Sequence, residues 1–240
     1  MLAEARAQIV RQAQKLEELV KARLEVDVPG MVAGVRARLD SRLHLTAHTI
    51  DADLASKPGP FGLGQVRTWA WEAPEARKVV LSHVSRRPMI EGLALVIHPA
   101  PGRAAPIFGA DLMALPTRIS VNADVYGARS RTHGVFAELG ESFARLGSHL
   151  GPAWAQSLAS GSGLHARCSL RLVDDVFAAL TAALGRYVDV LASAPVTTGS
   201  DDGTGRDFFT AFHTHGPRRG PLGHILGAPW AERYSRLIFE

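Results

Sequence analysis

Between residues 65 and 126, strand-like segments follow one another with only short links between them. They read QVRTWAW (65–71), RKVVLSHV (77–84), GLALVIHP (92–99), PIFGADLMAL (106–115) and RISVNADVY (118–126). Gly or Pro falls in most of the gaps, as tight turns require. Parallel strands need a crossover of about a dozen residues or more, which these links do not provide. The middle of the chain therefore predicts an antiparallel meander.

Helical patterns lie on both sides of these strands. Residues 2–24 have apolar positions at three- and four-residue steps, and Pro29-Gly30 ends that pattern. The clearest helix is predicted over 170–193, with a buried stripe at Leu172, Val176, Leu180, Leu184, Tyr187 and Leu191. Weaker predictions are a strand over 43–51, helical stretches within 134–158, a polar loop over 194–207 and a closing helix within 220–240. We predict the α+β class: one domain over residues 1–240, a three-layer α/β/α sandwich whose helices cover both faces of a central antiparallel sheet.

Composition narrows the class of protein. The chain has 240 residues, of which 46% are hydrophobic and 21% charged, so it has enough apolar residues for one core. No apolar run reaches the roughly 18 residues of a membrane helix, and the charged N-terminus lacks the apolar stretch of a secretory signal. With a single cysteine, Cys168, we expect a cytoplasmic protein without disulfides.

The net charge of +4 suits an anionic small molecule or an acidic protein partner. The basic residues are spread along the chain without a long run, which argues against nucleic acid.

No familiar cofactor or metal motif is present: GxGxxG, GxxxxGK[ST], HExxH and GxSxG are all missing. His165 and Cys168 lack further spaced ligands. In FHTHG, His213 and His215 would point the same way in an extended chain. They are interpreted as exposed loop residues or as the lining of an anionic pocket, and we predict no metal site.

Asp111 is the sharpest signal, because it is an acid inside an apolar strand. Alternation places Ile107, Gly109, Asp111 and Met113 on one face, and Gly109 leaves room beside the acid for a flat ligand. Desolvation would raise the pKa of such a carboxyl group and make it a proton donor near neutral pH. A structural aspartate satisfied by a backbone N–H or an arginine is the equal alternative.

Two stretches resemble the ferredoxin-dependent bilin reductases. APIFGADLMA is similar to the family's P-[IL]-F-G-x-D-[LIV] signature, and LGHILGAPWAERYSRLIFE is similar to its closing helix. EARKVVLSHVSRRPMIEGLALVIHPAP fits the hairpin before the signature. Order and spacing agree over residues 70–125 and 170–240.

The resemblance implies an α/β/α sandwich that binds an open-chain tetrapyrrole, biliverdin or a dihydrobiliverdin, between the sheet and the C-terminal helices. It implies that reduced [2Fe-2S] ferredoxin supplies single electrons, that the chain binds no cofactor of its own, and that it is a monomer to which acidic ferredoxin docks. Asp111 then passes a proton to the pigment, with His215 and His98 as further candidates. The substrate-binding candidates are Ser120, which matches a serine near a propionate, together with Asn122, Val96, Phe108, Gly109 and Arg218.

The chain departs from the phycocyanobilin-forming branch of that family at three places. Ser82 stands where that branch has a glutamate, and Ala94 where it has a catalytic histidine. His215-Gly216 replaces an Asn-Asp pair before a basic cluster. Several interpretations stay open: a two-electron reduction, a relay through His215 or His98, a carrier that binds a tetrapyrrole without reducing it, a reductase of a chlorophyll-derived tetrapyrrole, or an unrelated α+β protein in which Asp111 is structural.

Overall fold

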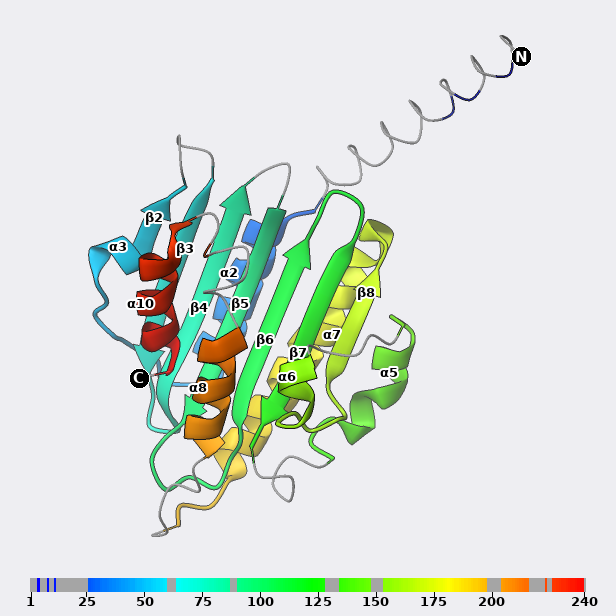
Figure 1. Ribbon diagram of the computed structural model, residues 1–240. Coiled ribbons are helices and arrows are strands. Elements are labelled where there is room, and N and C mark those ends of the chain that lie inside the picture. The colour runs from blue at the N-terminus through cyan, green and yellow to red at the C-terminus, as the bar shows by residue number, and fades with distance from the viewer. Residues whose placement is uncertain are drawn as a thin grey trace.

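The computed structural model describes residues 26–59, 64–86, 90–127, 134–147, 153–197, 204–215 and 226–239, with single residues 4, 8, 11 and 223. They form three layers, with a twisted sheet between two sets of helices (Figure 1). This arrangement confirms the predicted α+β sandwich.

The described part of the chain forms an eight-stranded antiparallel sheet. Its strands run in the order β1-β3-β4-β5-β6-β7-β8, with β2 also paired to β3. The central strands are β3 (Gln65–Glu72), β4 (Ala76–Arg86), β5 (Ile90–Pro99), β6 (Ile107–Ala114) and β7 (Ile119–Tyr126). The edges are β1 (Thr46–Ala47), β2 (Ser56–Pro58) and β8 (Leu164–Cys168). Each central strand pairs with the next along the chain, as the short links predict.

Helices α2 (Val28–Asp40) and α7 (Val173–Ser193) pack behind the sheet (Figure 1). The predicted stripe of α7 is buried from Val176 to Leu191, while Leu172 lies in the 3-10 turn η3 (Leu170–Leu172) and is half-buried. Phe108 stacks on Tyr187 at a centroid distance of 4.9 Å inside this core. Together with η3, α7 is long and apolar enough to span a membrane, but it serves as the core helix of the fold, so this property is weak evidence for a span.

Helices α8 (Thr204–His215) and α10 (Ala228–Phe239) lie on the opposite face, over β3 to β6 (Figure 1). A second, smaller core joins them to the sheet. Trp230 and Tyr234 of α10 stack at 5.1 Å, and Phe208 of α8 stacks on Tyr126 at 4.2 Å. Three short elements complete this side and the edge: α3 (Ala52–Ala55), α6 (Ala153–Gln156) and, after the 3-10 turn η2 (Ala137–Leu139), α5 (Gly140–Ala144).

The structure differs from the sequence prediction at several elements. Pro29 does not end a helix but lies in the first turn of α2, where proline is tolerated because no intrahelical N–H bond is needed. Asp27 caps this turn by accepting a hydrogen bond from the Gly30 N–H at 3.0 Å. The predicted strand over 43–51 shrinks to β1, and α8 begins inside the predicted loop over 194–207. Strand β8 was not predicted. The helix predicted over 2–24 falls outside the described residues apart from single positions.

Candidate functional site

One row of side chains crosses the sheet on the face that α8 and α10 cover in part. Paired residues have adjacent side chains, since neighbouring strands lie about 4.8 Å apart. From β3 to β8 the row is Thr68, Ser82, Ala94, Asp111, Asn122 and His165. Its β3–β4 end is buried, whereas Asp111 is exposed and the next two residues are half-buried. A ligand can therefore reach the row at β6 to β8.

Asp111 is the acid of this row. Asn122 Nδ2 donates to both of its carboxylate oxygens, at 3.2 and 3.1 Å. The side chain is accessible to solvent but lies among enough protein atoms that desolvation raises the pKa of Asp111 to about 6, an effect that the Asn122 hydrogen bonds and the charge of His165 partly offset. The carboxyl group is thus reachable, and with a pKa of about 6 it can both hold and release a proton in mildly acidic solution, as a proton donor must.

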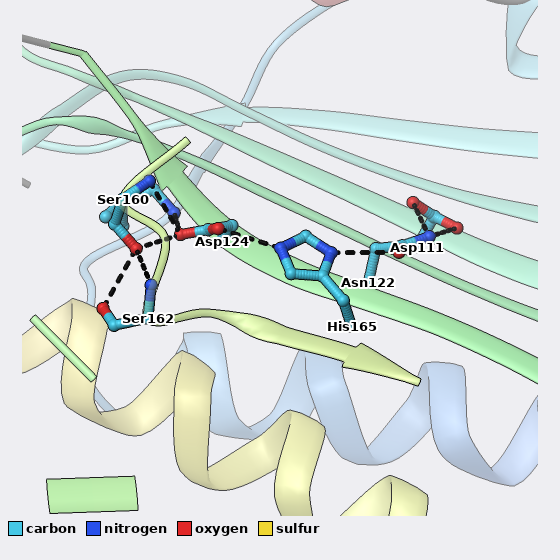
Figure 2. A network of polar contacts seen from close by, with 7 residues as sticks. Asp111, Asn122, Asp124, Ser160, Ser162 and His165 are labelled. Carbon is cyan, nitrogen blue, oxygen red and sulfur yellow. Dashed lines mark hydrogen bonds and ion pairs between the residues drawn. The ribbon is translucent and has the colours of Figure 1, made fainter. Parts of the chain in front are cut away.

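Behind Asp111, a hydrogen-bonded chain runs along β7 and β8 (Figure 2). Asn122 Oδ1 lies 3.1 Å from His165 Nδ1, and His165 Nε2 lies 2.9 Å from Asp124 Oδ2. Asp124 is fully buried and pairs with His165 as an ion pair when the imidazole is protonated. The acid at the surface is therefore connected to a second, buried carboxylate through an amide and an imidazole.

The loop before β8 encloses the Asp124 carboxylate. Its Oδ1 accepts from the Val125 N–H at 2.7 Å, from the Ser160 N–H at 3.3 Å and from the Ser160 hydroxyl. Gly163 lies against the carboxylate, and a Cβ there would come within 2.6 Å of the Asp124 Oδ2 atom and of the Ala123 carbonyl oxygen. Only glycine fits at this position, so the backbone is shaped around a charged group.

A second row lies beside the first, about 7 Å along the strands. In this row Ser120 pairs with Met113 on one side and with Arg167 on the other. Arg167 is exposed, and within the described residues it makes no salt bridge. A serine hydroxyl next to a guanidinium is suited to bind a carboxylate.

Two comparisons with known proteins bear on this arrangement. The family model for ferredoxin-dependent bilin reductase matches residues 32–239. The chain belongs to this family. Its fold is similar to the solved structure of phytochromobilin synthase from tomato in complex with biliverdin, with a TM-score of 0.75 and 13% identity over 87% of this chain and 81% of that chain. Among curated proteins, none matches. Bilin reduction with electrons from ferredoxin is the activity for which the family is named.

In this bilin reductase fold, the space beside Gly109 is already filled. A Cβ on Gly109 would lie 2.9 Å from the Tyr126 ring and 3.8 Å from Phe208. Val96, which pairs with Gly109, is buried in the same apolar cluster. The flat group next to Gly109 is thus the Tyr126 ring. Val96 and Tyr126 form an apolar wall beside Asp111, where the sequence predicted an open space for a flat ligand.

His98 does not serve as an accessible proton donor. Its Nε2 donates to the Ile238 carbonyl oxygen of α10 at 2.7 Å, and Arg77 Nη2 lies 3.5 Å from its Nδ1. Burial and the positive charge of Arg77 lower the pKa of His98 to about 3. The imidazole is therefore neutral at physiological pH and holds the C-terminal helix to β5, which corrects the catalytic assignment.

Phe108 also leaves the candidate site. Its side chain is fully buried on the α7 face, between Phe136 and Tyr187. Because alternate residues of a strand point to opposite faces, Phe108 cannot lie on the face of Asp111. Phe108 therefore fills the core, and this position corrects the expectation that it binds substrate.

His215 and Arg218 stay predictions. His215 is the last residue of α8, but its side chain is outside the described set, and Arg218 lies outside the described residues altogether. The extended-chain argument for His213 and His215 does not hold, because both positions are helical, where residues two apart are separated by about 200° around the axis.

Of the three places where the resemblance indicates a departure from the phycocyanobilin-forming branch, two lie in the row of Asp111. Ser82 is buried, accepts from the Tyr234 hydroxyl at 2.8 Å and lies 3.2 Å from Thr68 Oγ1. Ala94 directly opposes Asp111 and carries no polar group. A closed hydroxyl cluster and a methyl group thus occupy the places of the glutamate and histidine.

Three residues of this site were not identified from sequence: His165 and Arg167 as site residues, and Asp124 as the partner of His165. Alternation within LHARC was the available signal, since Leu164 and Ala166 are buried in the large core while His165 and Arg167 face the other way. The segment is only five residues long, and its pairing with β7 is nonlocal. Without that pairing, His165 has no visible connection to Asn122.

Proposed function

We propose that this protein reduces one double bond of an open-chain tetrapyrrole, biliverdin or a dihydrobiliverdin. Two reduced ferredoxins each lose one electron, and the pigment gains two electrons and two protons. Asp111 donates a proton to the reduced pigment and becomes a carboxylate. Its exposure allows water to reprotonate it for the next transfer.

The observation that carries this proposal is the position of Asp111. An acid with a pKa of about 6 lies on the exposed part of the sheet face, among groups that do not form an ion pair with it directly. A purely structural aspartate would be expected to be satisfied by backbone N–H groups or an arginine, whereas this one is contacted by a side-chain amide.

The second row suggests how the pigment is oriented. Biliverdin carries propionate groups. Ser120 offers a hydroxyl one strand from Asp111, and Arg167 offers a guanidinium two strands away. We propose that a propionate binds there, so that the pyrrole nitrogens lie over Asp111. His215 and Arg218 remain candidates for contacts from the C-terminal side.

The residues of the central row favour a two-electron reaction. Ser82 is tied to Tyr234, Ala94 has no proton, and His98 is neutral and bound to α10. In the described part of the row, Asp111 is therefore the one carboxylic acid exposed to a ligand. A four-electron reduction would require further donors near a second ring.

The electron donor is proposed from the family and the charge. The net charge of +4 favours encounter with an acidic ferredoxin through long-range attraction. We expect turnover to weaken as salt rises, because screening shortens the range of that attraction.

A carrier that binds the pigment without reducing it is the second candidate, because Ser82 and Ala94 remove two donors. The test is anaerobic incubation of the purified protein with biliverdin, ferredoxin, its reductase and NADPH, followed by spectroscopy and chromatography of the product. Reduction that Asp111→Asn abolishes with pigment binding intact supports the enzyme. The matched control is Asp40→Asn, which removes one exposed charge on the opposite layer. A bound spectrum that never changes supports the carrier, no binding refutes both, and turnover of a chlorophyll-derived tetrapyrrole but not of biliverdin would reassign the substrate.

A further inference from the structure

The hydrogen bonds of Figure 2 link the protonation of His165 to the orientation of the Asn122 amide. Asn122 presents Nδ2 to both Asp111 oxygens, so its Oδ1 faces His165 Nδ1 at 3.1 Å. An amide oxygen only accepts, and therefore Nδ1 carries a proton. On the other side of the ring, Nε2 lies 2.9 Å from Asp124 Oδ2.

Asp124 is surrounded by hydrogen-bond donors. It accepts from two backbone N–H groups and one hydroxyl, all from Val125 and Ser160, in addition to the imidazole. Three donors of this kind stabilise a buried carboxylate. In this orientation of the amide, both ring nitrogens donate, and His165 is an imidazolium with Asp124 as its counter-ion.

Reversing the Asn122 amide requires a different proton arrangement. Its Oδ1 would then face Asp111, which must be protonated to donate to it, and its Nδ2 would face a His165 Nδ1 without a proton. The amide thus has two consistent orientations. One pairs an imidazolium with the Asp111 carboxylate, and the other pairs a neutral imidazole with the Asp111 acid.

We propose that His165 is a positioning residue for proton donation: as an imidazolium held by Asp124, it orients the Asn122 amide so that both of its N–H bonds receive the Asp111 carboxylate formed when the proton leaves. This inference rests on the proposed function, because it concerns the same proton transfer. The positive group supports Asp111 from β8, on the opposite side from Ala94. His165 acts through Asn122, because its two ring nitrogens face Asn122 and Asp124.

Among the residues that the structure describes, we consider the titratable groups on the strands and helices around His165. Asp111 lies on β6, Asp124 and Tyr126 on β7, and Arg167 two residues along β8. Burial and the two aspartates raise the pKa of Tyr126 further above its usual range, so the phenol stays neutral. Helix α5, which packs beside β8, contributes the exposed Glu141, and α6 contributes no titratable group.

The test measures the titration of Asp111 by carboxyl 13C NMR in the protein without pigment, with the signal assigned by its loss in Asp111→Asn. His165→Gln should raise the proton affinity of Asp111 by roughly two- to tenfold, the effect expected when the hydrogen bonds from the Asn122 amide to the carboxylate are no longer held in place. In an Asn122→Ala background the same substitution should have a clearly smaller effect, because the amide transmits the influence. His44→Gln, an exposed position after α2, is the control and should leave the titration unchanged.

Where His165→Gln does not fold, Asp124→Asn removes the counter-ion at constant size and should shift Asp111 in the same direction. In turnover, both variants should lower kcat with little change in KM for the pigment and move the alkaline limb of the pH profile upward. An unchanged Asp111 titration, or equal shifts with and without Asn122, overturns the inference. Wild-type protein that reduces no tetrapyrrole refutes the proposed function itself, whereas normal turnover with an unaltered pH profile in the variants refutes only the role of His165.

Discussion

We expect kcat/KM for pigment reduction to fall as pH rises above about 6, because Asp111 donates only in its protonated form. Desolvation sets the pKa of that carboxyl group to about 6 in the free protein, and kcat/KM reports the ionisation of the free enzyme. About ten in eleven molecules carry the proton at pH 5, about one in eleven at pH 7 and about one in a hundred at pH 8. The rate should therefore drop close to tenfold per unit on the alkaline side.

The assay is anaerobic steady-state reduction of biliverdin between pH 5 and 8.5, with ferredoxin kept reduced so that electron supply does not limit the rate. Asn122→Ala provides the internal check. Loss of the two hydrogen bonds to the carboxylate should raise the pKa of Asp111 further and move the alkaline limb to higher pH. A flat profile over this range, together with a solvent isotope effect showing that proton transfer limits the rate, would refute the assignment of Asp111 as donor.

Three further outcomes follow from the packing and charge of the fold. The folded-state pKa of Asp111 lies above its ordinary value of 3.8. Between about pH 4 and 6 the folded protein therefore binds more protons than the unfolded protein, and its free energy of unfolding falls as pH rises through that window. Asp111→Asn should lessen this fall in urea titrations across the same range. His98→Ala should lower the free energy of unfolding by about 1–3 kcal/mol through loss of the bond to α10, without moving the pH profile of turnover. Gly163→Ala should lower the free energy of unfolding by about 1–3 kcal/mol, because the added methyl group crowds Asp124. Gly140→Ala, where a Cβ meets nothing within 4 Å, should change it little. Equal denaturation midpoints for the two variants would contradict this account.

Local pattern predicted much of the fold. Period-two alternation located β3 to β7, and the apolar stripe from Val176 to Leu191 located the core of α7. Both signals are strong because each element buries one face continuously, so the sequence repeats the geometry of the element. The same alternation placed Asp111 and Gly109 on one face.

Short or nonlocal elements were beyond that reasoning. Two residues suffice for β1, five for β8, and helix α8 starts in a Gly-rich stretch that resembles a loop. Phe108 was assigned to the site from a motif although its own alternation put it on the other face. His98 was predicted to be a proton donor, but it is buried under α10. Its partner there, Ile238, lies 140 residues later in the chain, and a strand pattern does not reveal such a distant contact.

The sequence by itself determined an antiparallel sheet between helical layers and an acid at Asp111, because periodicity and a misplaced charge are local properties of the chain. Only the tertiary structure decided which groups surround that acid. Register across β6, β7 and β8 placed Asn122 and His165 beside it, and the loop at Ser160 closed around Asp124. A hydrogen-bonded chain depends on distances between strands that are far apart in sequence, and pairing fixes those distances only once the sheet has formed.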